Sequence, residues 1–425
     1  MKKQPPVPRP PLADIREIRI PRPTHRHLSN GMPLYDVRLG TQDILRLEVV
    51  FPAGRWFEAR PLAARATAWM LREGTLRRGA AEISELFDYY GATLRVEDGF
   101  DTTGLNLYCL AKHLPRVLPL FHELLTEPAF APGELADYVL RSRQRMIVDL
   151  EKVDVVAYRE LTELLFGSQH PYGYNSTVEG YDSLRPEDLR AHYEAWYRAE
   201  GARVFVAGKT SEPILELVGE TFRQGLSDKP ARHIPRHEAG GLPPTEKHVE
   251  KEKSSQTSIR IGRETFTKKH PDYQGLYVLN TVLGGYFGAR LMSNLREEKG
   301  YTYGVYSSLE TMNHSGYLYV GTEVDKAFRD EAVREIRHEM RRLCEEPLGA
   351  EELAMVRNYL LGNALRAFDG PFNVSEAMRD LVVEGLDLEF YDHFVDTVRH
   401  ITAAHLQDLA QRYLDPRDYT LVTVG

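Results

Sequence analysis

The sequence contains little cysteine and no long apolar segment, and both absences narrow the kind of protein that it can encode. Only two cysteines, Cys109 and Cys344, occur in 425 residues. They fall in different halves and form no C-x-x-C pair, so neither a disulfide framework nor a thiolate zinc site is predicted. No run of about 18 apolar residues occurs, so we expect no membrane span.

The chain also lacks an excess of positive charge. It carries 54 Lys and Arg against 62 Asp and Glu, which gives a net charge of -8 at pH 7. Because phosphate contacts require a basic surface, we expect no general nucleic-acid binding. The Gly-rich loops of nucleotide-binding proteins and the nucleophile elbow of the α/β-hydrolases are absent from the sequence too. With 42% apolar residues, the chain is long enough for two or more buried cores.

The N-terminal segment, residues 1–26, is rich in proline and charge. It opens with two lysines, as a secretory signal does, but prolines and further charges stand where an apolar core should follow. We interpret this segment as an extended Pro-rich arm. We therefore expect a cytoplasmic protein, with a periplasmic location as the alternative if a leader preceded this sequence.

The chain repeats itself over a long period. Leu124–Met146 parallels Leu343–Leu365, and the two segments begin 219 positions apart. Tyr193–Lys209 likewise parallels Leu409–Gly425. Each of these segments has the pattern of a helix followed by a strand, and the strand ends in a glycine. A period of this length indicates duplicated domains and not a solenoid of short repeats.

Each half has the same coarse order of predicted elements. A strand such as 44–51 is followed by a helix, then by paired strands such as 103–111 and 315–322, and then by amphipathic helices. Strands and helices occur in separate blocks, which favours an α+β fold over a doubly wound one.

One segment has the composition of a linker. Residues 227–255 contain several prolines and glycines and the mixed-charge run EKHVEKEK. We therefore predict an N-terminal domain over 27–226 and a C-terminal domain over 256–425. Two domains joined in this way are expected to move relative to one another.

The most informative stretch is Leu283–Ser308, LGGYFGARLMSNLREEKGYTYGVYSS. A helix is predicted through Ala289 and Leu295, and Arg296 and Tyr303 follow it at a spacing that lets both face one cleft. A guanidinium and a phenol suit a peptide carbonyl or carboxylate. The alternative is structural: the arginine complements the helix C-terminus and the tyrosine packs in a strand.

This stretch closely resembles the C-terminal-domain signature of the pitrilysin-type (M16) metallopeptidases. The resemblance implies two homologous domains like those of the mitochondrial processing peptidases, each an antiparallel-rich sheet packed with helices, which together form half of a clamshell. An arginine and a tyrosine at this spacing bind the substrate peptide near the scissile bond in that family. They correspond to Arg296 and Tyr303 here.

The family's zinc motif is missing from the first half. Catalytic members carry H-x-x-E-H on the first helix of the N-terminal domain and a third, acidic ligand on a later helix. The corresponding positions here hold Arg65, Ala68 and Trp69. None of these side chains can ligate zinc or act as the general base. Asp149 or Glu151 could stand at the place of the third ligand.

The remaining histidines do not restore a metal site. His122 and His338 each precede a glutamate but have no second histidine four residues away. His233 and His237 are four residues apart but lie among prolines, so we expect them in the linker. We expect no metal in this chain.

Arg65 stands where a zinc ligand would. We hypothesise that it pairs with Asp149 or Glu151, so that a cation occupies the place of the metal. The alternative is that it reaches solvent.

The resemblance and the missing motif together predict a substrate-binding subunit that is not an enzyme on its own. It would belong to a heterodimeric M16-type zinc metalloendopeptidase, whose other subunit bears the H-x-x-E-H motif and holds the zinc. This chain would contribute Arg296 and Tyr303 to orient the peptide. Two other hypotheses remain at this point: a structural scaffold, and a catalytically inactive homodimer that binds peptides.

Overall fold

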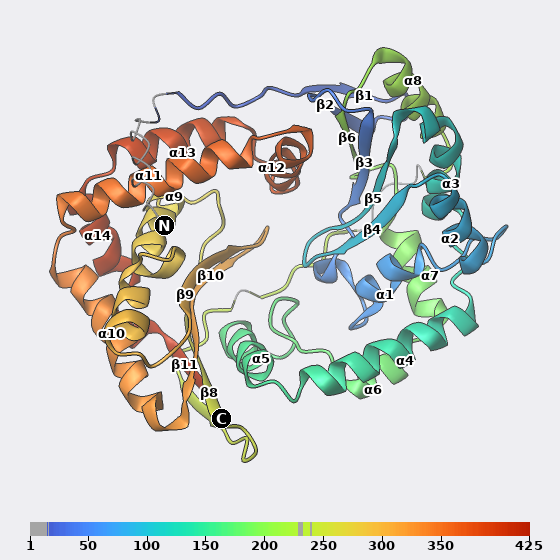
Figure 1. Ribbon diagram of the computed structural model, residues 1–425. Helices are drawn as coiled ribbons and strands as arrows, with labels where there is room; N and C mark the ends of the chain where they lie inside the picture. The colour runs from blue at the N-terminus through green and yellow to red at the C-terminus, as the bar shows by residue number, and fades with distance from the viewer. Residues whose placement is uncertain (1–14, 16, 228–232, 239) are drawn as a thin grey trace, which may run out of the picture.

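The computed structural model describes residues 15, 17–227, 233–238 and 240–425. Two α+β halves lie side by side in a curved arrangement, the first half at the right of Figure 1 and the second at the left. The α+β fold predicted from the sequence is confirmed. In the part of the chain that is described, no helix is both long enough and apolar enough to cross a membrane.

The first half contains a six-stranded sheet in the order β1-β2-β6-β3-β5-β4. Its strands are β1 (Thr24–His27), β2 (Pro33–Arg38), β3 (Ile44–Phe51), β4 (Thr93–Asp98), β5 (Thr103–Leu110) and β6 (Arg203–Gly208). Its α-helices are α1 (Ala63–Met70), α2 (Ala80–Tyr89), α3 (Leu114–Thr126), α4 (Pro132–Asp149), α5 (Val153–Phe166), α6 (Val178–Asp182), α7 (Pro186–Trp196) and α8 (Glu212–Thr221).

The second half contains a five-stranded sheet in the order β7-β11-β8-β10-β9. Its strands are β7 (Glu246–Val249), β8 (Gln256–Thr265), β9 (Val305–Thr311), β10 (Gly316–Asp325) and β11 (Thr420–Val424). Its helices are α9 (Tyr273–Asn280), the π-helical segments η3 (Thr281–Gly285) and η4 (Met292–Glu298), α10 (Arg329–Glu345), α11 (Ala350–Ala367), α12 (Pro371–Val383), α13 (Glu389–His400) and α14 (Ala403–Tyr413).

The two sheets share one topology. The order β2-β6-β3-β5-β4 in the first matches β7-β11-β8-β10-β9 in the second. β2 is parallel to β6 as β7 is to β11, and the other corresponding pairs are antiparallel in both sheets. The structure thus confirms the duplication that the sequence repeat predicts.

The predicted domain boundaries do not coincide with the first strands of the two sheets. β7 lies within the segment predicted as a linker and pairs with β11 at the edge of the second sheet. β1 begins at Thr24, so the last residues of the predicted arm pair with β2, whereas residues 1–14 and 16 lie outside the described residues.

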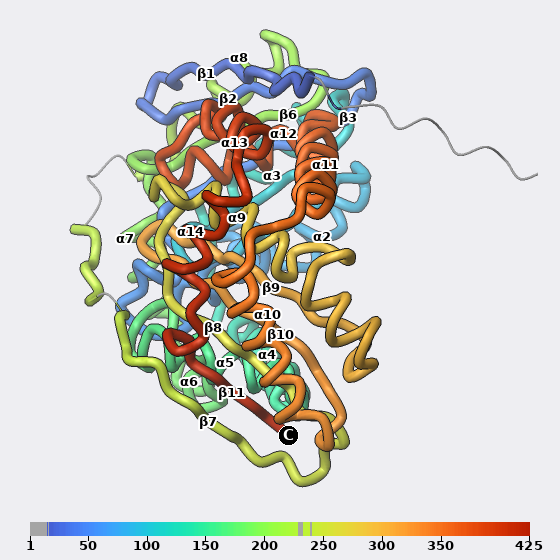
Figure 2. The backbone as a smooth tube through the Cα atoms, turned by 90° about the vertical axis from the view of Figure 1, so that its left-hand side faces the viewer, coloured from blue at the N-terminus to red at the C-terminus, as the bar shows by residue number. Residues whose placement is uncertain are grey.

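Each half contributes a helix to the sheet of the other half. α5 of the first half packs on β8 and β11, and α12 of the second half packs on β2 and β6. Figures 1 and 2 both place α12 beside β2. Val374 and Leu381 of α12 are buried in one apolar cluster with Val37 and Phe205 of the first sheet.

A buried arginine adds polar contacts across the same junction. The Arg46 side chain on β3 is fully buried and contacts Glu48, Asn106 and, on α12, Glu376, each at 2.9 Å. A junction with an apolar core and ion pairs of this kind opposes the free movement of the halves that the linker composition predicts.

Candidate functional site

Arg65, Ala68 and Trp69, the positions predicted for the missing zinc motif, lie on α1. The Ala68 side chain is fully buried, so this position carries only a methyl group inside the fold. Arg65 is half exposed and Trp69 is partly buried. α1 contacts α4, α7 and β4, and these neighbours determine what Arg65 and Trp69 can reach.

Arg65 and Trp69 bind the same carboxylate, Asp98 at the end of β4. Arg65 Nε lies 3.0 Å from Asp98 Oδ2, and Trp69 Nε1 donates a hydrogen bond of 3.1 Å to Asp98 Oδ1. Burial raises the pKa of Asp98, while the charge of Arg65 and the indole N–H of Trp69 oppose that rise. Arg65 and Trp69, the residues predicted at the two histidine positions of the motif, therefore share one aspartate.

The predicted partner of Arg65, Asp149 or Glu151, was wrong, because the carboxylate that pairs with Arg65 is that of Asp98. Asp149 forms an ion pair of 2.7 Å with Lys152 at the C-terminal end of α4. The reason is geometric: α1 packs on β4, so the guanidinium meets the end of that strand before it reaches the end of α4. An ion pair between Arg65 and Asp98 therefore links α1 to the end of β4.

The described residues contain no group of three or more His, Cys, Asp and Glu that could hold a metal ion. His237 of the predicted linker contacts the first half instead, with Nε2 at 3.0 Å from the carbonyl oxygen of Trp56. His314 stacks on the Trp56 ring with centroids 3.8 Å apart, and His170 meets it edge-on. Burial lowers the pKa of His170 to about 4, so this ring is neutral at pH 7.

A buried glutamate beside α1 was not singled out from the sequence. The Glu58 carboxylate accepts a hydrogen bond from the Tyr174 hydroxyl and one of 3.0 Å from the backbone N–H of Ala64, at the start of α1. Burial raises the pKa of Glu58 to about 7. A lone glutamate in an irregular segment gives no sequence signal, because only the fold brings Tyr174 to it.

Arg296 and Tyr303 line one groove of about 680 Å³ in the second half. Arg296 lies on η4, and its guanidinium carbon is 4.9 Å from the centroid of the Phe287 ring. Tyr303 precedes β9 and is 91% exposed, so the packing alternative does not hold for this tyrosine. The structure brings the two predicted residues to the same groove with their polar ends accessible.

Gly284 is required beside this groove. A Cβ atom on Gly284 would lie 2.6 Å from the backbone nitrogen of Ser307 on β9, closer than real Cβ contacts allow. The absence of a side chain at Gly284 therefore lets η3 pack directly on β9. Gly285 also lines the groove and is exposed, and a Cβ atom there would meet its nearest neighbour at 3.3 Å.

The fold and the site define a class: a protein of two duplicated α+β halves whose described residues include no group of side chains that could hold a metal ion. Residues 183–360 match the family described as the Peptidase M16 inactive domain. A solved structure of a peptidase M16 inactive domain from Pseudomonas fluorescens superposes with a TM-score of 0.84 at 22% identity, covering 95% of this chain and 98% of that one.

Two curated relatives extend over most of the chain. The "Uncharacterized zinc protease YmxG" of Bacillus subtilis is 24% identical over 363 residues, which cover 84% of this chain and 86% of the relative. The "Non-peptidase homolog YmxG" of Helicobacter pylori is 21% identical, with 85% and 84% covered. The chain is therefore similar to M16-type proteins, among them relatives whose printed names describe an inactive domain or a non-peptidase homologue.

Proposed function

We propose that this chain is the non-catalytic, substrate-binding subunit of a heterodimeric zinc peptidase. The partner would be an M16 subunit that bears the H-x-x-E-H motif and holds the zinc, and both would act in the cytoplasm. The observation that carries this proposal is the contrast between the two halves. The motif positions on α1 hold Arg65, Ala68 and Trp69, whereas Arg296 and Tyr303 share an accessible groove.

The groove offers hydrogen-bond donors without internal partners. Among the described residues, no hydrogen bond or ion pair engages the Arg296 guanidinium, which lies beside the exposed Phe287 ring. An arginine held by an aromatic face keeps its N–H groups free for an acceptor. A peptide carbonyl in the groove would supply that acceptor, and the Tyr303 hydroxyl would supply a second donor.

The contribution of such donors is positioning and charge stabilisation. The zinc of the partner would polarise the peptide carbonyl and activate water. Arg296 and Tyr303 would hold the peptide in register with that centre, and donors placed in advance lower the barrier even when they come from another polypeptide. Gly284 and Gly285 would let the peptide backbone approach closely.

The test is peptide hydrolysis by the assembled pair. Arg296→Ala is expected to lower kcat/KM by about 10- to 100-fold, the range that corresponds to the loss of one hydrogen bond from a charged donor, while the subunits still co-elute. Tyr303→Phe removes only the hydroxyl and is expected to have a smaller effect. Arg341→Ala, an exposed arginine on α10 outside the groove, serves as the control. Unchanged hydrolysis by the Arg296→Ala pair would refute the assigned role.

A further inference from the structure

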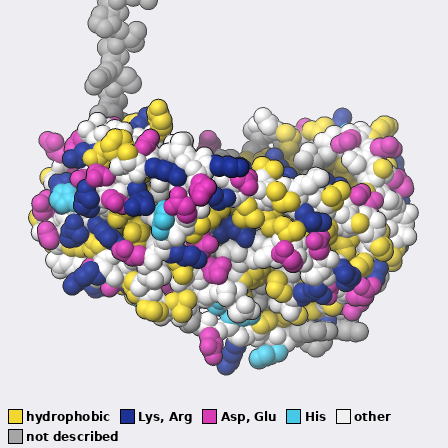
Figure 3. Space-filling model, turned by 90° about the horizontal axis from the view of Figure 1, so that it is seen from below, with side chains coloured by type: hydrophobic (Ala, Val, Ile, Leu, Met, Phe, Trp, Pro, Cys, Tyr) yellow, Lys and Arg dark blue, Asp and Glu magenta, His cyan; other side chains and the backbone are white. Residues whose placement is uncertain are grey.

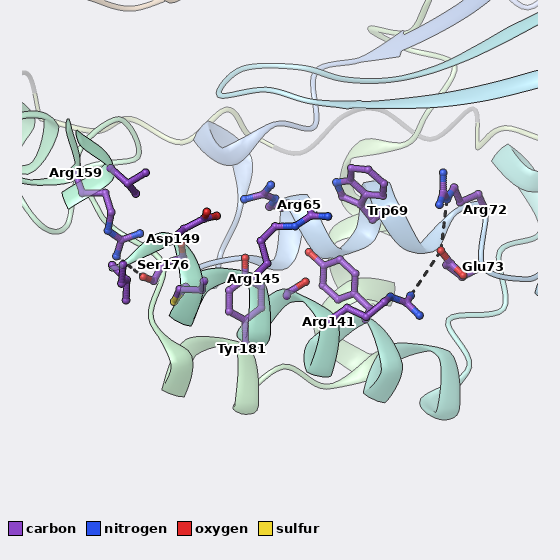
Figure 4. Close-up of a pocket in the computed structure, with 15 residues that line it drawn as sticks. Arg65, Trp69, Arg72, Glu73, Arg141, Arg145, Asp149, Arg159, Ser176 and Tyr181 are labelled. Atoms are coloured by element: carbon purple, nitrogen blue, oxygen red, sulfur yellow. Dashed lines mark hydrogen bonds and ion pairs between the residues drawn. The ribbon is translucent and has the colours of Figure 1, made fainter. Parts of the chain in front are cut away.

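The cavity beside α1, where the family's metal site would be, has five arginines among the fifteen residues that line it. It has a volume of about 330 Å³ and lies between α1 and α4 (Figure 4). Two carboxylates, Glu73 and Asp149, line it together with five arginines. The five are Arg65, Arg72, Arg141, Arg145 and Arg159.

Three of these arginines already have carboxylate partners. Arg65 binds Asp98 at 3.0 Å, outside the cavity lining. Arg72 and Arg141 approach the same carboxylate, Glu73, at 3.4 and 4.0 Å. One acid is thus shared between two cations.

The other two arginines have no carboxylate partner within ion-pair distance among the described residues. Arg145 is exposed on α4, and no hydrogen bond or ion pair engages it within the described ranges. Arg159 donates a hydrogen bond of 2.6 Å to the backbone carbonyl of Ser176. Asp149 is 2.7 Å from Lys152 and does not balance either of them. The lining of the cavity therefore carries more positive than negative charge, although Glu163 and Glu160 also act on the charge of Arg159.

A neighbouring cavity adds a further unsatisfied arginine. It has a volume of about 370 Å³ and shares Arg65 and Ser176 with the first. Arg55 lines it with its guanidinium 3.3 Å from the centre of the Tyr174 ring. Its Nε and Nη2 atoms are buried without a hydrogen-bond partner among the described residues. Buried N–H groups of this kind favour an acceptor from a ligand.

The positive charge is local to these cavities. The chain as a whole is acidic, and Figure 3 shows acidic and basic side chains interspersed over the face seen from below. A general basic surface would attract polyanions without discrimination. Arginines gathered in a cavity instead suit a single planar anion, because a guanidinium binds a carboxylate through two parallel N–H groups.

The other walls of the cavity suit the aliphatic part of an amino-acid residue that bears a carboxylate. Trp69, Tyr138 and Met146 supply apolar surface beside the arginines. The Tyr138 hydroxyl is buried and forms no hydrogen bond of normal geometry, although Ser142 lies beside it. A carboxylate with a short aliphatic stem would contact both kinds of surface.

We propose that the arginine cavity beside α1 binds a carboxylate of an acidic peptide, with Arg145 and Arg159 as its main donors. The carboxylate is either the C-terminus of the peptide or a Glu or Asp side chain within it. This inference rests on the proposed function as a peptide-binding subunit. It assigns the former metal site a new task, the selection of acidic substrates.

Equilibrium binding of fluorescein-labelled peptides to the full-length chain tests the proposal. The test peptide has 12 residues, which is about the span of one extended segment across a small domain. It contains two glutamates and has a free C-terminus. It is compared with its Glu→Gln form, its C-terminally amidated form and the form that carries both changes. The acidic peptide is expected to bind about tenfold more tightly than the form that carries both changes, since removal of a charge-assisted contact has an effect of this size. The preference is expected to shrink in 0.5 M salt because salt screens accessible charges.

Substitution of Arg145 assigns the preference to the cavity. Arg145→Gln is expected to reduce it at least about threefold, Arg145→Lys to retain most of it, and the double substitution Arg145→Gln with Arg159→Gln to abolish it. Arg341→Gln removes one exposed charge from α10, outside the cavity, and is expected to leave the preference unchanged. Circular dichroism confirms that each variant folds.

The outcomes separate this inference from the proposed function. Equal binding of all four peptides, or a charge preference that survives the double substitution, would overturn the inference and leave peptide binding intact. Failure of every peptide to bind either the chain or its complex with the zinc subunit would refute the proposed function as well. If amidation alone removes the preference, the ligand is the C-terminus; if Glu→Gln alone removes it, the ligand is a side chain.

Discussion

Replacement of Asp98 by Asn tests whether one carboxylate holds α1 against the first sheet. The substitution removes the ion pair with Arg65 and turns the hydrogen bond from Trp69 into one to a neutral amide. The Arg65 side chain is 49% exposed, so the ion pair contributes only about 0.2–1 kcal/mol. A hydrogen bond to an ionised group contributes about 1 kcal/mol more than one to a neutral group. We therefore expect Asp98→Asn to destabilise the first half by about 1–2 kcal/mol.

Tryptophan fluorescence during urea denaturation measures this loss in the correct half of the molecule. The chain contains three tryptophans, Trp56, Trp69 and Trp196, and all of them lie in the first half. Asp149→Asn is the matched control: it also removes a helix-end ion pair, but the pair with Lys152 is exposed and is expected to contribute less to stability than the pair of Asp98. Equal shifts for Asp98→Asn and Asp149→Asn, or no shift for Asp98→Asn, would refute the role assigned to Asp98.

Three further changes test other parts of the structure. Glu376→Ala removes the α12 carboxylate that binds buried Arg46. Because the Glu376 side chain is 48% exposed, we expect the free energy of unfolding in urea to fall by only about 1 kcal/mol. An unchanged denaturation midpoint would contradict the junction described above. The pKa of Glu58 is raised from 4.5 to about 7, so the folded state binds this proton more tightly than the unfolded state, and stability should fall as the pH rises from about 4.5 to 7. Burial also raises the pKa of Glu48 to about 7, so Glu58→Gln should reduce that slope without abolishing it, and should raise stability at pH 8 by up to about 3 kcal/mol in urea denaturation. A slope in Glu58→Gln that equals that of the unsubstituted chain would assign the pH dependence to other groups. Gly284→Ala places a methyl group against Ser307 and should lower the stability measured by thermal unfolding by about 1–3 kcal/mol. Gly285→Ala should have a smaller effect, because a Cβ atom at Gly285 would meet its nearest neighbour at 3.3 Å. Equal effects of the two substitutions would contradict the packing of η3 on β9.

The sequence predicted the duplication because the two patterns that indicate it, those of the strands and of the helix-strand ending, can each be recognised within a short segment. Strands such as β3 alternate or run apolar, and the repeated helix-strand ending recurs at nearly the same offset in both halves. The retained segment around Arg296 and Tyr303 was recognisable for the same reason, since its residues are close in sequence. The structure shows that they are also close to one groove.

The sequence could not predict which elements from different parts of the chain meet. An amphipathic helix has the same pattern whichever sheet it covers, so the exchange of α5 and α12 between the halves left no signal. β7 has four residues, three of them exposed, and stands beside prolines and glycines, so it resembled a linker. Arg65 was expected to meet α4, yet the packing of α1 on β4 brings Asp98 to it first.

The arginine cavity could not be predicted from the sequence either, for a similar reason. Its arginines come from α1, α4, α5 and the turn after α1, so only the folded chain gathers them (Figure 4). In the sequence each one resembles an ordinary exposed helix residue. The cluster became visible only once the fold placed α1 against α4.

Hydrolysis of a peptide substrate by purified subunits, with the metal content of each, tests the central claim most directly. The chain would be assayed alone and after mixing with an M16 homologue that bears the H-x-x-E-H motif. The account predicts hydrolysis only in the mixture, zinc only in the homologue, and a large loss with Arg296→Ala. Zinc-dependent hydrolysis by this chain alone, or a homologue whose activity does not change when this chain is added, would contradict it.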